Sequence, residues 1–114
     1  MFVVSNRIPV ATGHEDAFAE RFRSRAGLVE GHAGFLRLHI LRPTELDMHG
    51  RRMGRSLYHI VLTYWDCVED FVAWTNSEDF KTAHSDRPPA EMFSGENVFE
   101  LHEVIQSAEP MAST

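Results

Sequence analysis

The sequence has one cysteine, Cys67, among its 114 residues. A single cysteine excludes an internal disulfide and is typical of a reducing compartment. The sequence also lacks an apolar run of about 20 residues, the length that a membrane-spanning helix requires. No basic segment precedes the apolar residues 2–4, so we expect no signal peptide. These absences favour a cytoplasmic protein that is not embedded in a membrane.

Positive charge is scarce as well. The sequence has 11 Lys and Arg residues against 17 Asp and Glu residues, and its formal net charge is −6. A nucleic-acid-binding domain is usually basic, so we expect no nucleic-acid partner. The glycine-rich motifs of dinucleotide- and phosphate-binding loops are absent, so the electrons for any redox reaction must come from an external donor. The apolar fraction of 43% and the charged fraction of 25% are those of a folded protein.

Two kinds of periodicity divide the chain into strands and helices. Alternation predicts strands over residues 2–10, 35–42, 57–65 and 97–106. Helical spacing predicts helices over about 15–30, 66–75 and 77–84. The resulting β-α-β-β-α-β order predicts a ferredoxin-like α+β sandwich. We expect one domain over residues 1–106, followed by a frayed tail over residues 107–114.

The helix ends and the loops carry local signals. Thr12 and Glu15 match a capping box with Thr12 as the N-cap. Asp66 is expected to cap the second helix, and Asn76 or Ser77 the third. The predicted apolar stripes are Phe18, Phe22, Ala26 and Val29 on the first helix and Val68, Phe71, Val72 and Thr75 on the second. Residues 43–56 are expected to form a long polar loop.

The strands carry apolar residues on both faces. The predicted helix-side face holds Phe2, Val4, Asn6, Ile8 and Val10 of the first strand and Leu36, Leu38 and Ile40 of the second. Apolar neighbours point to opposite faces at Val3 and Val4, at Ile40 and Leu41, and at Ile60 and Val61. Two helices can cover only one face of a sheet. We therefore expect a homodimer in which two sheets pack face to face as a dimeric α/β barrel.

Three residues are candidates for a ligand site. Asn6 lies on an apolar strand face, where an amide without partners costs about 1–3 kcal/mol, so it either bonds a nearby backbone group or contacts a ligand. Trp74 lies at the edge of the second helical stripe, either as core rim or as the wall of a pocket. His84 ends the third helix, either as an exposed histidine or as a ligand of a metal or of haem iron.

The sequence resembles the antibiotic-biosynthesis-monooxygenase superfamily in four segments. These are Asn6-Arg7, Gly34-Phe35-Leu36, Phe71-Val72-Ala73-Trp74 and Phe80-Lys81-Thr82-Ala83-His84. Within the superfamily, the combination of Asn6, Trp74 and His84 is similar to the haem-degrading monooxygenases of the IsdG and MhuD type. The resemblance implies a ferredoxin-like oxidoreductase that binds haem and opens it.

The resemblance also implies a role for each of the three residues. His84 would be the axial ligand of haem iron through a neutral ring nitrogen. Trp74 would press on the porphyrin and ruffle it out of plane, and Asn6 would hydrogen-bond to oxygen bound at the iron. Distal hydrogen bonds and distortion of the macrocycle are two ways in which a protein controls haem.

Phe22 and Arg25 share a face of the first helix because they are three residues apart. The resemblance implies that Phe22 lines the pocket and that Arg25, or Arg21 one turn back, meets a haem propionate. In the alternative interpretation Phe22 is core and the arginines lie in solvent. The long loop departs from the resemblance, and either docks an acidic electron donor or lies in solvent with its arginines, Arg51, Arg52 and Arg55.

Other groups permit weaker hypotheses. His84 and Asp86 have the spacing of two ligands of a non-haem iron site, which His102 would complete. We expect Cys67 to be a buried, inert thiol. The remaining histidines are interpreted as structural or exposed, and His39 and His59 as able to face each other on paired strands.

The sequence therefore predicts a haem-degrading monooxygenase. Haem would be both substrate and cofactor, O2 the second substrate, and an external electron donor such as a reductase the source of electrons, with iron released. Two alternatives stay open: a cofactor-independent monooxygenase acting on an aromatic polyketide or quinol, and a carrier that holds haem without turnover.

Overall fold

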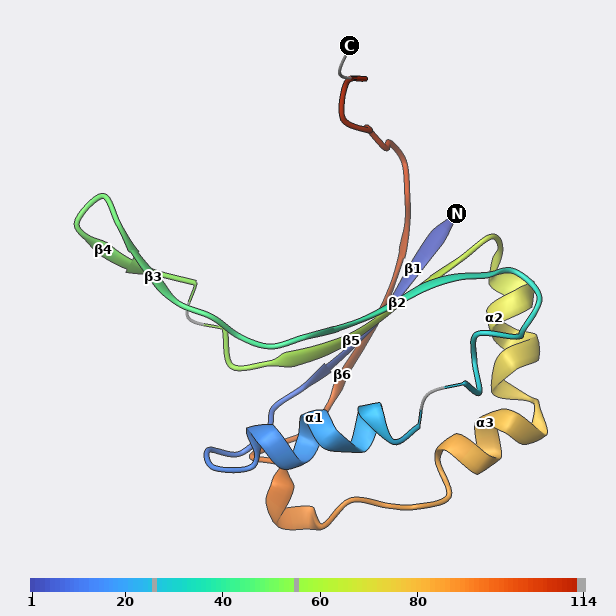
Figure 1. Ribbon diagram of the computed structural model, residues 1–114, viewed down its shortest axis with the longest axis horizontal. Coiled ribbons are helices and arrows are strands. Elements are labelled where there is room, and N and C mark those ends of the chain that lie inside the picture. The colour runs from blue at the N-terminus through green and yellow to red at the C-terminus, as the bar shows by residue number, and fades with distance from the viewer. Residues whose placement is uncertain (26, 55, 113–114) are drawn as a thin grey trace.

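The computed structural model describes residues 1–25, 27–54 and 56–112 (Figure 1). Its strands are β1 (Phe2–Ile8), β2 (Phe35–Leu41), β3 (Leu46–Met48), β4 (Arg51–Met53), β5 (His59–Trp65) and β6 (Val98–Glu103). Its helices are α1 (Glu15–Arg23), α2 (Val68–Thr75), α3 (Glu78–Ala83) and the 3-10 turn η1 (Ala90–Met92). None of the helices in these ranges has the length and apolarity needed to cross a membrane.

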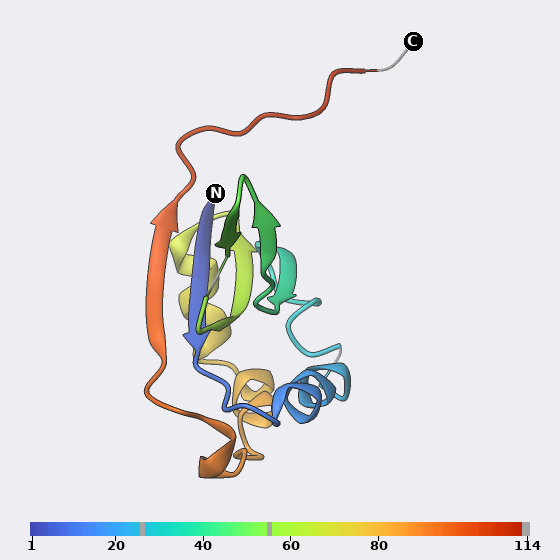
Figure 2. The ribbon, with the colours of Figure 1, turned by 90° about the vertical axis from the view of Figure 1, so that its left-hand side faces the viewer.

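Four strands form one antiparallel sheet in the order β2-β5-β1-β6. Figure 2 shows β6, β1 and β5 side by side, and Figure 1 shows α1, α2 and α3 on one side of this sheet. This strand order and the element order are those of a ferredoxin-like α+β fold, as the sequence predicts. The segment after β6 runs away from the sheet in both views.

The core lies between the sheet and the helices, where apolar strand residues face apolar helix residues. One cluster of buried side chains contains Phe2, Val4, Trp65 and Trp74, and a second contains Ile8, Phe18 and Met92. The register pairs Phe2 with Trp65 and Val4 with Thr63, so these residues share the helix-side face. The alternation predicted for the first strand is therefore confirmed.

The first helix is shorter than predicted and begins differently. It ends at Arg23 rather than near residue 30, and Ala26 of the predicted stripe lies outside the described residues. Its N-cap is His14, not Thr12. Gly13 has a positive φ of 92°, and its N–H donates to the Glu15 carboxylate at 3.0 Å. The glutamate reaches back as in a capping box, but the tight turn at Gly13 moves the helix start beyond Thr12.

The second helix also differs from the prediction, both in its N-cap and in the face that it buries. Its N-cap is Cys67 rather than Asp66. Val68 and Val72 of the predicted stripe are 48% and 46% exposed, whereas Trp74 is buried and Phe71 half-buried. The buried face is thus centred on the two aromatic rings. Larger rings bury more apolar surface than valines, which determines which face packs on the sheet.

Of the two predicted N-cap candidates for α3, Asn76 and Ser77, the structure uses Ser77. Its hydroxyl oxygen accepts the backbone N–H of Phe80 at 3.1 Å, and the side chain therefore caps the helix. The backbone N–H of Ser77 in turn donates to the Trp74 carbonyl at 3.0 Å, at the end of α2. One residue thus joins the two helices that carry Trp74 and His84.

The second strand has a bulge near its start. Phe35 pairs with Trp65 and Arg37 pairs with Tyr64, so an extra residue, Leu36, intervenes on β2. Phe35 packs in the core and Leu36 is 46% exposed, contrary to the predicted face. The following residues Leu38 and Ile40 keep the predicted side, because they pair with Thr63 and Val61.

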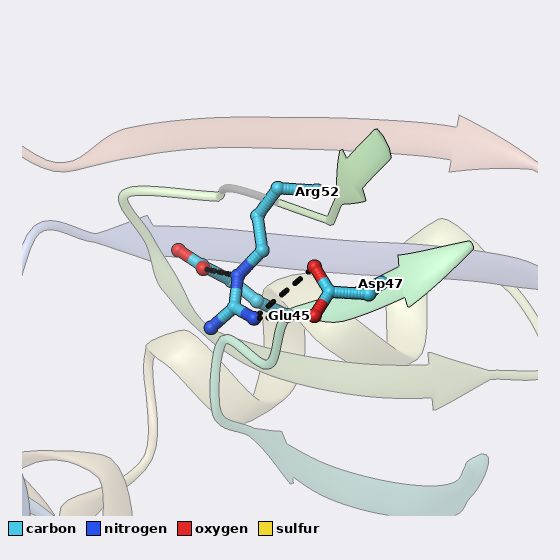
Figure 3. Close-up of polar contacts among 3 residues, drawn as sticks. All are labelled: Glu45, Asp47 and Arg52. Atoms are coloured by element: carbon cyan, nitrogen blue, oxygen red, sulfur yellow. Dashed lines mark hydrogen bonds and ion pairs between the residues drawn. The ribbon is translucent and has the colours of Figure 1, made fainter. Parts of the chain in front are cut away.

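The prediction of a structureless loop over residues 43–56 is wrong. β3 and β4 form a separate two-stranded hairpin that projects away from the helices (Figure 1). His49 and Gly50 join the strands with φ values of 53° and 75°, as in a type I′ turn. Arg52 Nε donates to Glu45 Oε2 at 2.6 Å and Nη1 contacts Asp47 at 3.3 Å (Figure 3). Three-residue strands are too short for alternation to reveal them.

Candidate functional site

A cavity of about 610 Å³ lies between the helix-side face of the sheet and the helices. Its lining is largely apolar and comes from β1, α1, α2, α3 and the strands beside β1. The five residues singled out from the sequence all line it, namely Asn6, Phe22, Arg25, Trp74 and His84. A mostly apolar cavity with a few polar groups is the usual form of a small-molecule site.

Asn6 lies on the central strand β1, opposite Val61 of β5 and Phe99 of β6. The side chain is half-buried and faces the cavity, on the predicted side of the strand. Among the described residues its amide has no hydrogen-bond partner. The amide is therefore free to bond a ligand. The alternative prediction, a hydrogen bond to a nearby backbone group, is wrong.

His84 follows the last turn of α3 as its C-cap residue. Its Nδ1 lies 2.7 Å from the Phe80 carbonyl oxygen, and its ring stacks on the Phe80 ring at 4.0 Å. A carbonyl oxygen only accepts hydrogen bonds, so Nδ1 carries the proton in this contact. The lone pair of the neutral ring then lies on Nε2, the nitrogen that a metal can take.

Trp74 forms the buried wall of the cavity. It is 8% exposed and belongs to the core cluster rather than to the rim. The Phe80 ring meets the indole edge-to-face at 5.5 Å, and the His32 ring does so at 4.8 Å. The sequence interpretation placed Trp74 beside the helical stripe, whereas it lies at the centre of the buried face.

The two candidate arginines have different partners. Arg25 lies over the Phe22 ring at 5.2 Å and lines the cavity without an ion pair among the described residues. Burial, and next the neighbouring Arg21, lowers the pKa of Arg25. Arg21 instead donates to the Asp86 carbonyl, and its Nη1 lies 3.6 Å from Asp86 Oδ2. Of the two, Arg25 is the cation that lines the cavity.

The non-haem iron alternative is not supported by the geometry. Asp86 contacts Arg21, and His102 pairs with Val3, whose side chain lies on the opposite face of the sheet from the cavity. Within the ranges that the structure describes, no three His, Cys, Asp or Glu residues are placed to hold a metal ion. His84 is therefore the one predicted ligand of that set that reaches the cavity.

Two minor predictions are wrong. Cys67 is exposed, and its thiol donates to Asp70 Oδ2 at 3.0 Å, a contact that raises the pKa of the thiol. His39 does not face His59, because it pairs with Leu62 whereas His59 pairs with Ile8. His59 is buried, and burial lowers its pKa.

Sequence reasoning missed the contact between His32 and the site. His32 lies in the turn before β2, and its ring meets Trp74. Its Nε2 lies 3.0 Å from Asp79 Oδ2 in the first turn of α3. The two residues are 47 positions apart, so no local spacing pattern connects them.

The fold and cavity define a ferredoxin-like α+β protein with a ligand pocket between sheet and helices. The profile of the family described as "Antibiotic biosynthesis monooxygenase" matches residues 1–86. The chain therefore belongs to the antibiotic biosynthesis monooxygenase family.

Relatives of this chain include proteins with named functions. A heme oxygenase (staphylobilin-producing) of Staphylococcus haemolyticus is 38% identical over 87 residues, which cover 76% of each chain. A heme-degrading monooxygenase of Bacillus mycoides is 31% identical over 113 residues, or 99% of this chain and 98% of that one.

Solved structures show the same fold. The heme-degrader MhuD of Mycobacterium tuberculosis, with two hemes bound in its active site, has a TM-score of 0.73 at 27% identity. The match covers 96% of this chain and 100% of that chain. SnoaB of Streptomyces nogalater, a cofactor-independent oxygenase, has a TM-score of 0.65 at 16% identity over 93% and 94% of the two chains. At that identity the likeness is one of fold alone.

Proposed function

We propose that this protein is a haem-degrading monooxygenase that binds haem in the cavity and opens it with O2 and external electrons, releasing iron. The observation that carries the proposal is the geometry of His84. Its Nδ1 donates a hydrogen bond to the Phe80 carbonyl, so its Nε2 is available to bind a metal beside an apolar cavity. The Staphylococcus, Bacillus and Mycobacterium proteins are named as a heme oxygenase, a heme-degrading monooxygenase and a heme-degrader, and these names support the same reaction.

The residues of the cavity fit haem chemically. A porphyrin is a large apolar plane with two carboxylates at one edge, and the cavity offers an apolar lining with one unpaired guanidinium, Arg25. When bound, haem supplies the redox-active iron at which O2 and electrons react. His84 would hold the iron through Nε2, and Arg25 would bind a propionate. Phe22, whose ring lies beneath the Arg25 guanidinium, would pack against the porphyrin.

Asn6 and Trp74 act on the bound ligand in different ways. Among the described residues the Asn6 amide has no hydrogen-bond partner, so it would donate a hydrogen bond to the ligand inside the cavity. The Trp74 indole is a large, buried wall that would press on the porphyrin and bend it. No acid–base pair of the protein is assigned a role.

We further propose a homodimer in which the helix-free faces of two sheets pack together. Side chains of alternating residues point to that face, and its apolar members include Val3, Ile60 and Leu62. Leu41 and Val98 extend it and are 40% and 38% exposed. Arg7 and Glu100 pair across it at 3.1 Å. Sedimentation as a monomer at micromolar concentration would contradict this part of the proposal.

The physiological setting follows from the same reasoning. The single cysteine and the absence of nucleotide-binding motifs favour the cytoplasm and an external electron donor such as a reductase. The hairpin is a poor docking site for an acidic donor through Arg52, since Glu45 and Asp47 already neutralise that residue. Arg55, also considered for docking, lies outside the described residues.

A haemin titration of the purified protein tests the function. We expect a saturable Soret band that differs in His84→Ala, and that bleaches with iron release when ascorbate is added in air. Catalase must leave the rate unchanged, because free peroxide also destroys haem. A band that persists under ascorbate would leave a haem carrier, and the lack of any saturable band would favour the cofactor-independent monooxygenase.

A further inference from the structure

The indole of Trp74 is held by packing in the core cluster and by contacts with two other rings. Within the described part of the chain its N–H has no hydrogen-bond partner. In contrast, the Trp65 N–H donates to Thr63 Oγ1 at 2.9 Å. Edge-to-face contacts hold an aromatic ring at a preferred angle. The rings that meet Trp74 in this way are Phe80 at 83° and His32 at 70°.

His32 is itself held in place from two sides. Its backbone N–H donates to the Val29 carbonyl at 3.1 Å, and its carbonyl accepts the N–H of Phe35 at 3.2 Å, so the turn is fixed at both ends. Its side chain is 24% exposed, and Nε2 lies 3.0 Å from Asp79 Oδ2. The imidazole is thus clamped between a carboxylate and the indole.

Asp79 connects this clamp to the ligand side of the cavity. It precedes Phe80, whose ring contacts Trp74 at 5.5 Å and stacks on His84 at 4.0 Å. The Phe80 carbonyl also accepts the Nδ1 proton of His84. A shift of the first turn of α3 would therefore move both groups that meet the ligand.

We propose that His32 and Asp79 are a pair of positioning residues that set the angle of the Trp74 indole against the cavity. The consequence for catalysis rests on the proposed function. The angle of the indole would determine how the porphyrin is bent, and hence which of its meso carbons is oxidised. A purely structural role would leave that choice unchanged and affect stability only.

Near-ultraviolet circular dichroism of the protein without haem tests the first part. Trp74→Phe identifies the Trp74 band against that of Trp65. We expect His32→Leu and Asp79→Leu to alter the Trp74 band in the same way, with an unchanged far-ultraviolet spectrum. Glu78→Leu is the matched control, since the neighbouring Glu78 contacts Lys81 at 3.3 Å and not the clamp.

Product analysis after ascorbate-driven turnover tests the consequence. The ratio of product isomers should shift in both clamp variants and stay at the wild-type value in Glu78→Leu. If a leucine variant fails to fold, His32→Gln and Asp79→Asn replace it. Gln at 32 keeps a donor for Asp79, so it should retain more of the wild-type ratio than His32→Phe, which keeps only the ring.

The outcomes separate the two proposals. Folded clamp variants with an unchanged Trp74 band, or with a changed band and an unchanged isomer ratio, would overturn the positioning role. A wild-type protein that forms no haem complex would overturn the proposed function. The band measurement without haem would still decide whether the clamp orients Trp74.

Discussion

The two tryptophans occupy opposite kinds of environment within one core cluster. Trp65 on β5 is fully buried, its N–H is bonded to Thr63, and the rings of Phe35 and Phe71 pack on it. Trp74 on α2 is also buried, but one side faces the cavity, and among the described residues its N–H has no hydrogen-bond partner. The first region is closed on itself, whereas the second borders an open cavity. The difference distinguishes residues that stabilise the fold from residues that line the candidate site.

The largest effect should come from the closed region. Trp65→Ala removes a fully buried ring and should lower the free energy of unfolding by about 3–5 kcal/mol. Trp74→Ala should cost clearly less, since part of its surface already borders a cavity. Urea denaturation of both variants measures the difference, and equal losses would contradict the comparison.

The next effect should come from the ligand side of the cavity. His84→Ala should weaken haemin binding by at least about tenfold, or roughly 1.4 kcal/mol, because the variant would lose the proposed iron ligand. The exposed ring leaves no buried partner behind, so the free energy of unfolding should change by only about 0.5 kcal/mol. Titration and denaturation should be run beside His102→Ala, whose side chain lies on the other face of the sheet. A haemin affinity equal to that of wild type would contradict the assignment.

A third effect, on the pH dependence of stability, should come from His59, which packs on Phe18 of the second core cluster. His59 is buried against Phe18, and among the described residues its Nε2 has no hydrogen-bond partner. Burial lowers the pKa of His59 below 6.5, because its effect exceeds the opposing attraction of Glu15. The unfolded state therefore binds the proton first, and stability should fall as the pH drops below about 6.5. At higher pH this contribution is fully present.

Denaturation midpoints between pH 8 and pH 5 measure that dependence. In His59→Phe the decline should be smaller than in the wild type. A wild-type slope in His59→Phe would show that other groups cause the acid sensitivity.

The smallest effect is expected in the β3–β4 hairpin. Arg52→Ala removes two exposed ion pairs, which contribute little in water. We expect the global unfolding transition to stay the same and amide hydrogen exchange over residues 46–53 to accelerate, because the hairpin is a separate two-stranded unit. A changed global midpoint would mean that the hairpin folds together with the core.

Much of the fold could be predicted because its signals are local. The alternation of Phe2, Val4 and Ile8 identified the buried face of β1, and the pair Asn76-Ser77 located the start of α3 to within one residue. The position of Asn6, Trp74 and His84 around one cavity also agrees with the sequence hypothesis. Their catalytic roles stay predictions until the haem experiments are done.

The errors share a cause. Gly13 moved the start of α1, the bulge after Phe35 displaced Leu36, and the rings of Phe71 and Trp74 outweighed Val68 and Val72 in choosing a face. Each was decided by a contact or a backbone angle that periodicity does not contain. The hairpin was missed because its strands have three residues each.

The sequence by itself determined the element order, the helix-side face of β1 and the residues able to bind a metal or a ring, since these depend on side-chain chemistry and short spacings. Only the tertiary structure decided that Arg25 rather than Arg21 faces the cavity, and that His32 and Asp79 hold Trp74. These choices depend on which distant segments meet when apolar surface is buried, and a linear pattern does not encode such meetings.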